Sequence, residues 1–347
     1  MPKTRGHIIV LVAINLLLLA AGAAISGGSF LSIFNLQSMA NQLPEIGLLA
    51  IGVMLAMCAG NGGIDLSGIS LANLSGVLSA VVVAGMFSSV ENEFAFSVAF
   101  IAGAVLIGLA GGVINGVLIS KLGITPILCT LGTQMAFTGL AVVVSAGRAV
   151  TVGSPEPLSS IGNGYILELP ISFLIYIAAA LLIAAVLRYT RFGFWLMLMG
   201  TNPKAAEYAG FPTDRVVIAT YAISGTLSGL AGVIIAARNV NVKWDYGTSY
   251  LLIAILIAVM AGVRPEGGYG RVANVVLAAI ALQLLSSMLN FGGLSNFVRD
   301  FAWGALLLAF LAVARFDLIG FAFRGSGQQA ALARAPRAAG EGSNIKQ

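Results

Sequence analysis

The chain has 347 residues, of which 59% are hydrophobic and only 9% are charged, and its mean hydropathy is +0.98. A soluble domain carries roughly 25% charged residues. The composition therefore excludes a water-soluble surface and predicts an all-α protein that crosses the membrane many times. The formal charge of +5 comes without a basic stripe interleaved with aromatic residues, so no nucleic-acid partner is expected.

Runs of about 20 apolar residues match a hydrocarbon core ~30 Å thick. With charges and turn residues as boundaries, they predict about ten transmembrane helices in one membrane domain that covers residues 1–323. The first run follows Lys3 and Arg5 but exceeds the ~7–15 residues of a secretory signal core, so it is expected to remain as a span. The predicted spans are 8–26, 45–60, 67–88, 94–119, 124–146, 171–188, 214–237, 248–263, 271–291 and 297–315.

Two segments fall outside these spans. Residues 30–44, FLSIFNLQSMANQLP, are mildly amphipathic and predict an interfacial helix between the first two spans. Residues 324–347 are polar and small and show no periodicity, which predicts a disordered cytoplasmic tail.

Ten spans place both termini on the same side of the membrane. If that side is cytoplasmic, it holds 14 of the 18 lysines and arginines, and only Arg148, Arg238, Lys243 and Arg299 lie on the other side. This asymmetry agrees with the positive-inside rule. The prediction is a multi-pass membrane protein with both ends in the cytoplasm.

The stretch MGTNPKAAEYAGFPTDR (199–215) lies between two apolar spans and is too polar to enter the membrane. Asn202 is a strong helix N-cap, and Pro203 suits the first helical position. Gly210 is a natural helix end, and Pro212 prevents continuation. The pattern predicts a helix of about two turns, too short to be stable alone. It is either a docking helix for a cytoplasmic partner or a turn that merely joins two spans.

A second stretch, GNGGIDLSG (60–68), interrupts the apolar pattern. Gly62 and Gly63 break a helix, and Asp65 follows at once. Asp65 can cap the start of the next span near Ser67 and Gly68, where the helix dipole is positive. The alternative is that Asp65 lines a solute path beside a broken helix.

Few polar residues lie within spans, and they are amides and hydroxyls. Such groups suit the path of a neutral polyhydroxylated solute, although they also bind helices to one another. Charged groups are nearly absent there, which disfavours a proton-coupled pump. The residues predicted for a path are Asp65, Asn73, Asn115, Gln134, Gln283 and Asn290.

No catalytic or metal site is expected. The single histidine, His7, lies at the membrane edge, and no Gly-Lys pair of a phosphate-binding loop occurs. Cys58 and Cys129 lie in apolar segments and are expected to be free thiols. If ATP drives this protein, it must bind to another chain, and no cofactor is expected in this one.

Glycine is abundant inside the spans. Gly108, Gly112 and Gly116 are four residues apart, as are Gly225 and Gly229, a spacing that predicts close helix packing. Residues 48–67 and 251–270 both run from an apolar stretch through Ala-Gly to Gly-Gly, and Gly267 and Gly268 mark a second helix break. Gene duplication and coincidence both account for this similarity.

Four stretches together resemble the permease subunits of ribose-type bacterial ABC importers, the branch that includes transporters for pentoses, hexoses and autoinducer-2. They are GGIDLSG, KLGITPILCTLGTQMAFTGLAVVVSAGR, MGTNPKAAEYAGFPTDRVVIATYAISGTLSGLAGVIIAAR and AGVRPEGGYGR. Their order and spacing follow the family through nearly the whole chain. The chain departs from the family where Gly68 follows Ser67 directly and where Asn274 replaces a usual glycine.

The resemblance implies that the short polar helix is a coupling helix, which inserts into a groove of a cytoplasmic ABC ATPase. It also implies a second permease copy or a paralogue, a periplasmic solute-binding protein, and import of a sugar or sugar-like polyol by alternating access. An ion-coupled carrier is the main alternative, and a membrane enzyme has no suitable residues. The implied coupling residues are Thr201, Asn202, Pro203, Lys204, Ala205, Ala206, Glu207, Tyr208, Ala209 and Gly210.

Overall fold

Long apolar helices make up most of the structure, a computed structural model that describes residues 2–315. Within these residues, seven helices are long and apolar enough to cross a membrane. They are α1 (Pro2–Ile25), α2 (Ile33–Cys58), α4 (Glu93–Lys121), α5 (Pro126–Ser145), α7 (Ile171–Tyr189), α10 (Thr213–Asn239) and α12 (Val272–Phe291). Two shorter apolar helices, α3 (Gly68–Ala84) and α11 (Tyr250–Met260), and the helix α13 (Asn296–Arg315) occupy the remaining predicted spans.

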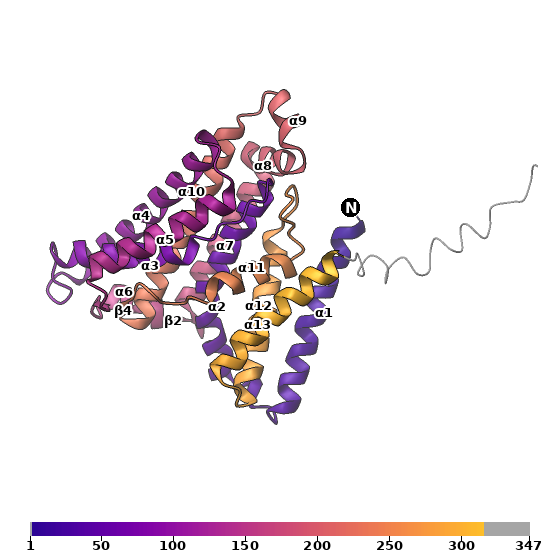
Figure 1. Ribbon diagram of the computed structural model, residues 1–347. Coiled ribbons are helices and arrows are strands. Elements are labelled where there is room, and N and C mark those ends of the chain that lie inside the picture. Colours follow the sequence, from indigo (N-terminus) through magenta and orange to yellow (C-terminus); the bar gives the residue numbers. More distant parts are fainter. Residues whose placement is uncertain (1, 316–347) are drawn as a thin grey trace, which may run out of the picture.

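The smaller elements gather at the two ends of the bundle. Helices α8 (Arg191–Thr201) and α9 (Pro203–Tyr208) form one end, which we call the α9 end (Figure 1). The other end, the hairpin end, carries η1 (Ser29–Leu31), α6 (Glu156–Asn163) and two small antiparallel pairs. These pairs are β1 (Val150–Thr151) with β4 (Asn241–Val242), and the hairpin of β2 (Tyr165–Ile166) with β3 (Leu169–Pro170).

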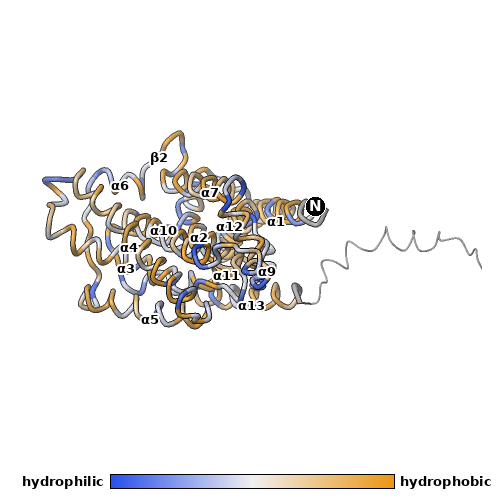
Figure 2. Tube along the Cα trace, turned by 90° about the horizontal axis from the view of Figure 1, so that it is seen from above, coloured by the Kyte–Doolittle hydropathy of each residue, from blue (hydrophilic) through white to orange (hydrophobic). Residues whose placement is uncertain are grey.

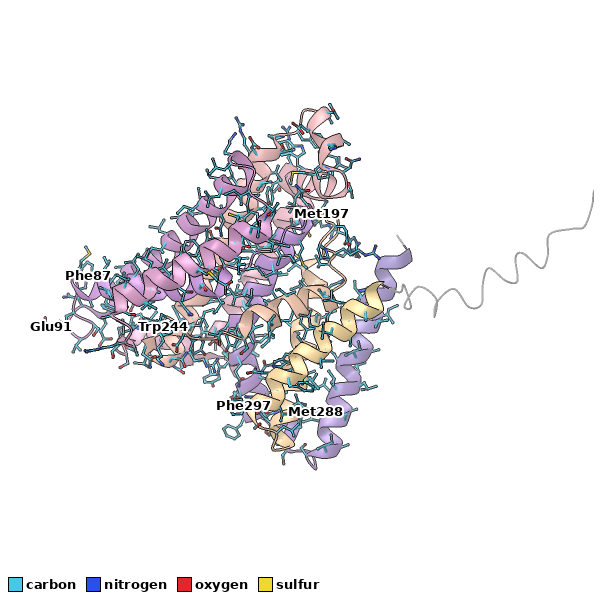
Figure 3. All side chains as sticks on the ribbon, viewed as in Figure 1. Phe87, Glu91, Met197, Trp244, Met288 and Phe297 are labelled. Carbon is cyan, nitrogen blue, oxygen red and sulfur yellow. The ribbon has the colours of Figure 1, made fainter. Side chains whose placement is uncertain are left out.

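The helices at the edge of the bundle consist mostly of hydrophobic residues, as Figure 2 shows for α4 and α5, and large apolar side chains on them are exposed. Leu17 of α1 and Leu128 of α5 are 67% and 65% exposed. At the hairpin end, Phe297 of α13 is also exposed and lies far from Met197 of α8 (Figure 3). A continuous apolar exterior of this kind fits lipid, in which spanning helices satisfy their own backbone groups.

Helices α4 and α10 pack with their backbones in contact. A Cβ atom on Gly112 would lie 2.2 Å from the carbonyl oxygen of Tyr221, and one on Gly225 would lie 2.2 Å from that of Gly108. Gly116 approaches Ile218 in the same way. The predicted close packing through these glycines is confirmed, and α4 and α10 form one rigid pair.

Helix α11 has only 11 residues, so at 1.5 Å per residue it is too short to cross the membrane. Residues 240–249, which precede α11, form no regular structure apart from strand β4, so their carbonyl groups need hydrogen-bond donors as partners. Asn73 of α3 supplies them, because its Nδ2 donates to the carbonyl oxygens of Trp244 (3.1 Å) and Tyr246 (2.9 Å). A side chain from α3 therefore holds the segment that leads into α11.

The predicted interfacial helix at residues 30–44 is wrong. Residues 33–58 form one continuous helix, α2, with Pro44 inside it and its second half wholly buried in the bundle. The amphipathic pattern arises because the polar side chains of the first half face a pocket between α2, α10 and the hairpin, as described below. The predicted disordered tail at 324–347 lies outside the described residues.

Candidate coupling surface and polar pathway

Helix α9 occupies the position predicted for the short polar helix. The Oδ1 atom of Asn202 accepts a hydrogen bond from the backbone N–H of Ala205 at 3.0 Å, and Pro203 is the first helical residue. Gly210 follows with φ of +75°, the left-handed conformation that ends many helices. Thr201 was predicted to belong to this short helix, but it is the last residue of α8.

Helix α8 was not predicted from the sequence, because its apolar residues resemble an extension of the preceding span. It packs against the chain that leaves α9: the ring of Phe211 lies 6.4 Å from that of Phe194 and 6.5 Å from that of Trp195. Within α9, only Ala206 is buried. The aromatic contacts thus fix the chain that leaves α9 against α8, and α9 presents all of its residues except Ala206 outward.

The exposed surface of α9 has mixed chemistry. Lys204 and Glu207 supply both signs of charge, and the side chain of Tyr208 is 93% exposed. Tyrosine is one of the residues that contribute most to binding when they become buried in a partner's pocket. This surface therefore has the composition of a docking site, and its only large aromatic group is Tyr208.

The N-cap gives a direct test of how α9 is stabilised. We expect Asn202→Ala to destabilise α9 by about 1 kcal/mol, because the N–H of Ala205 loses its acceptor. Hydrogen exchange of the amides at 204–208, measured by mass spectrometry, should become about fivefold faster. The control is Lys204→Ala, which removes an exposed side chain and leaves the cap intact. Equal exchange rates in the two variants would contradict this role of Asn202.

Immediately before α9, α8 meets both glycine-rich loops. A Cβ atom on Gly200 would lie 2.0 Å from the carbonyl oxygen of Cys58 and 2.3 Å from the backbone nitrogen of Gly268. The N–H of Gly268 itself donates to the carbonyl of Cys58 at 3.1 Å. Gly267 lies against Gly60, where a Cβ atom would be 2.4 Å from the Cα of Gly60. We call this contact of three backbones the glycine junction.

Of the predicted helix breaks, Gly267 and Gly268 contribute to this junction, whereas Gly62 and Gly63 lie in the same loop as Gly60 without contacting α8. Gly62, Gly267 and Gly268 have φ of +70°, +96° and +75°, so each adopts a conformation that favours glycine. Gly63 does not, but a Cβ atom there would lie 2.1 Å from the carbonyl oxygen of Ala56. The two segments whose sequences resemble each other, 48–67 and 251–270, thus also place their glycine loops in direct contact.

Asp65 lies in a buried polar network and is only 2% exposed. Its Oδ1 accepts hydrogen bonds from the N–H (3.0 Å) and hydroxyl (2.7 Å) of Ser67, and its Oδ2 accepts one from the hydroxyl of Ser224 (2.6 Å). The Nδ2 of Asn115 donates to the same Ser67 hydroxyl at 2.8 Å. Asp65 therefore binds Ser67, the residue that precedes α3, and not the first amides of α3 that it was expected to cap. The network joins the start of α3 to α4 and α10.

The residues predicted for a solute path do not form one lining. Asp65 and Asn115 share the network just described, and Asn73 holds the segment before α11. Gln283 donates to Gln42 at 3.4 Å nearer the hairpin end, and Asn290 accepts from Arg299 at 2.7 Å. The remaining predicted residue, Gln134, is half-buried on α5, and its Oε1 has no hydrogen-bond partner among the described residues.

The structure has an open pocket at the hairpin end that was not predicted from the sequence. It has a volume of about 260 Å³ and lies between the first half of α2, the end of α10 and strand β2. Its polar lining consists of Gln37, Ser38, Asn41, Gln42, Tyr165 and Arg238. The signal was present in the sequence, because the four residues of α2 have the spacing of one helical face.

A buried ion pair between Glu45 and Arg238 lies next to this pocket. Glu45 has no exposed surface, and its Oε1 accepts a hydrogen bond from Nη1 of Arg238 at 2.8 Å. Its Oε2 accepts from the hydroxyl groups of Tyr246 (3.2 Å) and Tyr250 (3.1 Å). Glu45 thereby connects α2, α10, the segment 240–249 and α11.

These features define a multi-pass helical membrane protein with a buried polar network and an exposed capped helix at one end. Residues 35–311 match the family described as "Branched-chain amino acid transport system / permease component". The chain therefore belongs to this family of permease components, which are transport subunits and not enzymes.

Individual relatives agree with the resemblance to ribose-type importer permeases. The chain is 33% identical to the ribose import permease protein of Bacillus subtilis (strain 168), over 85% of this chain and 89% of that protein. It is 29% identical to the L-arabinose transport system permease protein of Escherichia coli (strain K12), over 83% and 84%. It is 27% identical to the xylose/arabinose import permease protein of Sulfolobus acidocaldarius, over 83% and 79%. The family resemblance is confirmed.

Proposed function

We propose that this chain is the permease subunit of an ATP-driven importer that moves a sugar or sugar-like polyol into the cytoplasm by alternating access. The observation that carries the proposal is helix α9, which is capped by Asn202 and exposed apart from Ala206. An isolated helix of this length is not stable in water. We infer that docking in a groove of an ATPase subunit stabilises α9.

The contacts of α9 support its role in coupling. On one side, Gly200 of α8 connects it to both glycine loops through the glycine junction. On the other side, the chain continues into α10, whose Ser224 is hydrogen-bonded to Asp65. A displacement of α9 would therefore act at two places on the breaks that follow α2 and α11. ATP-driven closure of the ATPase subunits would use these connections to switch the pore between outward and inward access.

The same proposal assigns an orientation and partners. The α9 end faces the cytoplasm, in agreement with the excess of basic residues expected there, and both chain termini lie on that side. Two ABC ATPase subunits bind ATP and Mg²⁺ and dock on α9 of two permeases, identical or paralogous. A periplasmic solute-binding protein delivers the solute to the hairpin end, and lipid of the inner membrane covers the apolar exterior.

The substrate class rests on the relatives and on the polar residues of this chain. The three relatives are named for ribose, arabinose and xylose, whereas the description of the family names branched-chain amino acids. The buried polar groups are mostly amides and hydroxyls, which can exchange hydrogen bonds with a neutral polyol. Transport then depends on differential binding to two conformations and involves no bond formation.

Co-purification tests the proposal. The permease is purified with the ATPase subunit of the same cell, for the wild type, for Tyr208→Ala and for a chain with residues 203–209 scrambled. We expect the ATPase to bind the wild type, to bind Tyr208→Ala at least tenfold more weakly, and to be absent from the scrambled chain. Lys121→Met, which changes an exposed residue outside α9, should retain full binding.

Two results would contradict this function. Equal ATPase recovery with the scrambled chain would exclude α9 as the docking element. Solute uptake by the purified chain alone, driven by an ion gradient and sensitive to an ionophore, would identify an ion-coupled carrier instead.

A further inference from the structure

We propose that the pocket at the hairpin end is a binding site for a neutral polyhydroxylated solute, of the size of a free pentose. This inference rests on the proposed function for the class of solute and goes beyond it by naming the place. The site would receive solute at the outer face before the solute passes deeper into the bundle.

The first argument is the concentration of amides on one face of α2. Gln37, Ser38, Asn41 and Gln42 line the pocket at one helical face, in a helix whose second half is apolar from Ile46 onward. Each amide offers both donors and an acceptor. A solute hydroxyl group is also both donor and acceptor, so this face can bind several hydroxyl groups in either direction.

The second argument is the charge of the pocket. Arg238 supplies N–H donors, but its charge is balanced by Glu45 directly below it. At the rim, the carboxylate of Glu168 accepts from Nε2 of Gln37 at 3.1 Å. The pocket therefore combines a cationic donor with two carboxylates, an arrangement that disfavours a phosphorylated or carboxylated solute and is compatible with a neutral one.

The third argument is the hairpin that covers one side of the pocket. The hydroxyl of Tyr165 in β2 accepts a hydrogen bond from Nδ2 of Asn41 at 3.0 Å, and the carbonyl of Glu168 accepts one from Gln37 at 3.1 Å. These two contacts fix an aromatic ring beside the amides. Aromatic surface next to a few oriented polar groups is the usual composition of small-molecule sites.

The volume and the connection inward agree with a small solute. The volume of about 260 Å³ lies just below the ~300–1,000 Å³ of pockets that hold drug-sized ligands. Behind the pocket, Gln283 of α12 donates to Gln42, so a residue predicted for the path is bonded to the pocket lining. One polar residue of α12 therefore lies directly behind the lining of the pocket.

Direct binding to the purified permease tests this site. Wild-type protein in phosphatidylcholine nanodiscs is titrated separately with D-ribose, D-xylose and L-arabinose, and binding is measured by saturation-transfer difference NMR. At least one pentose should give a saturable signal, and D-ribose 5-phosphate should not compete with it. Ser38→Trp, which fills the pocket, and Asn41→Leu, which removes an amide at nearly constant size, should each reduce the signal at least fivefold.

The matched control is Leu36→Trp, which adds the same ring on another face of α2. It should retain the wild-type signal, and gel filtration establishes that all variants are folded. Absence of any pentose signal, an equal signal in Ser38→Trp and Leu36→Trp, or full competition by D-ribose 5-phosphate would each overturn the inference. Loss of the signal when phosphatidylglycerol is added would instead assign the pocket to a lipid headgroup and also overturn it.

Reconstituted uptake with the ATPase and the binding protein separates this inference from the function on which it rests. If the wild type shows no ATP-dependent uptake, the proposed function fails, whatever the NMR result. If uptake is present and Ser38→Trp lowers neither uptake nor the pentose signal, only the pocket assignment fails.

Discussion

Gly112→Leu is expected to destabilise the protein by about 3 kcal/mol or more. The new side chain would begin 2.2 Å from the carbonyl oxygen of Tyr221 and 3.0 Å from the Cα atom of Gly225, and neither backbone atom can move independently of its helix. Overpacking against side chains typically costs ~1–3 kcal/mol, and here the obstacle is main chain. Thermal unfolding in detergent, followed by tryptophan fluorescence, measures the effect as a lower midpoint or loss of folded protein.

Gly132→Leu is the matched control for this substitution. Gly132 also lies in a predicted span, but a Cβ atom there would meet no atom of the described residues within 4 Å. The same side chain should therefore leave the unfolding midpoint nearly unchanged. If both leucine variants lowered the midpoint equally, glycine would be needed for helix insertion in general and not for the contact between α4 and α10.

Arg238→Met is expected to have the second large effect, a loss of about 3–5 kcal/mol of stability. The substitution leaves Glu45 fully buried with only two phenol groups as partners, and an unpaired buried charge is strongly destabilising. The measurement is again the unfolding midpoint. The double variant Glu45→Gln/Arg238→Met should recover most of the loss, because the buried group is then neutral and keeps its hydrogen bonds to Tyr246 and Tyr250.

The exposed ion pair of Lys121 and Asp214 provides the comparison. Their side chains are 59% and 47% exposed, so water already solvates both charges. Lys121→Met should therefore change stability by no more than about 1 kcal/mol. A loss of equal size in Lys121→Met and Arg238→Met would show that burial of Glu45 does not determine the energetics.

The helices could be predicted from the sequence because lipid imposes a simple rule. Every span must satisfy its own backbone and present apolar side chains, so hydropathy alone located a helix in each of the ten predicted spans. The caps of α9 are equally local: Asn202 and Gly210 act on neighbouring amides and carbonyls, and their roles follow from residue type. The glycine contacts of α4 and α10 were also predictable from their spacing.

Long-range pairing could not be predicted in the same way. The partner of Asp65 on α10 is Ser224, 159 residues away, and no local pattern indicates it. Hydropathy also concealed α8, whose buried residues Leu196 and Met199 pack into the core of the bundle although the helix does not cross the membrane. The polar half of α2 was misinterpreted because amphipathicity indicates two environments without identifying them: a membrane interface and a polar pocket produce the same pattern.

The contact between α4 and α10 also has a consequence for biosynthesis. The ribosome completes α4 long before it begins α10. The glycine face of α4 therefore has no partner in the membrane while α5, α7 and α8 are synthesised. During that time Asp65 also lacks the hydroxyl of Ser224. Contacts so distant in sequence form late and leave partly assembled intermediates exposed. A nascent chain that stalls after α8 would therefore hold inserted helices with an unfilled groove and an unsatisfied carboxylate, a species that membrane quality control can distinguish from the finished protein.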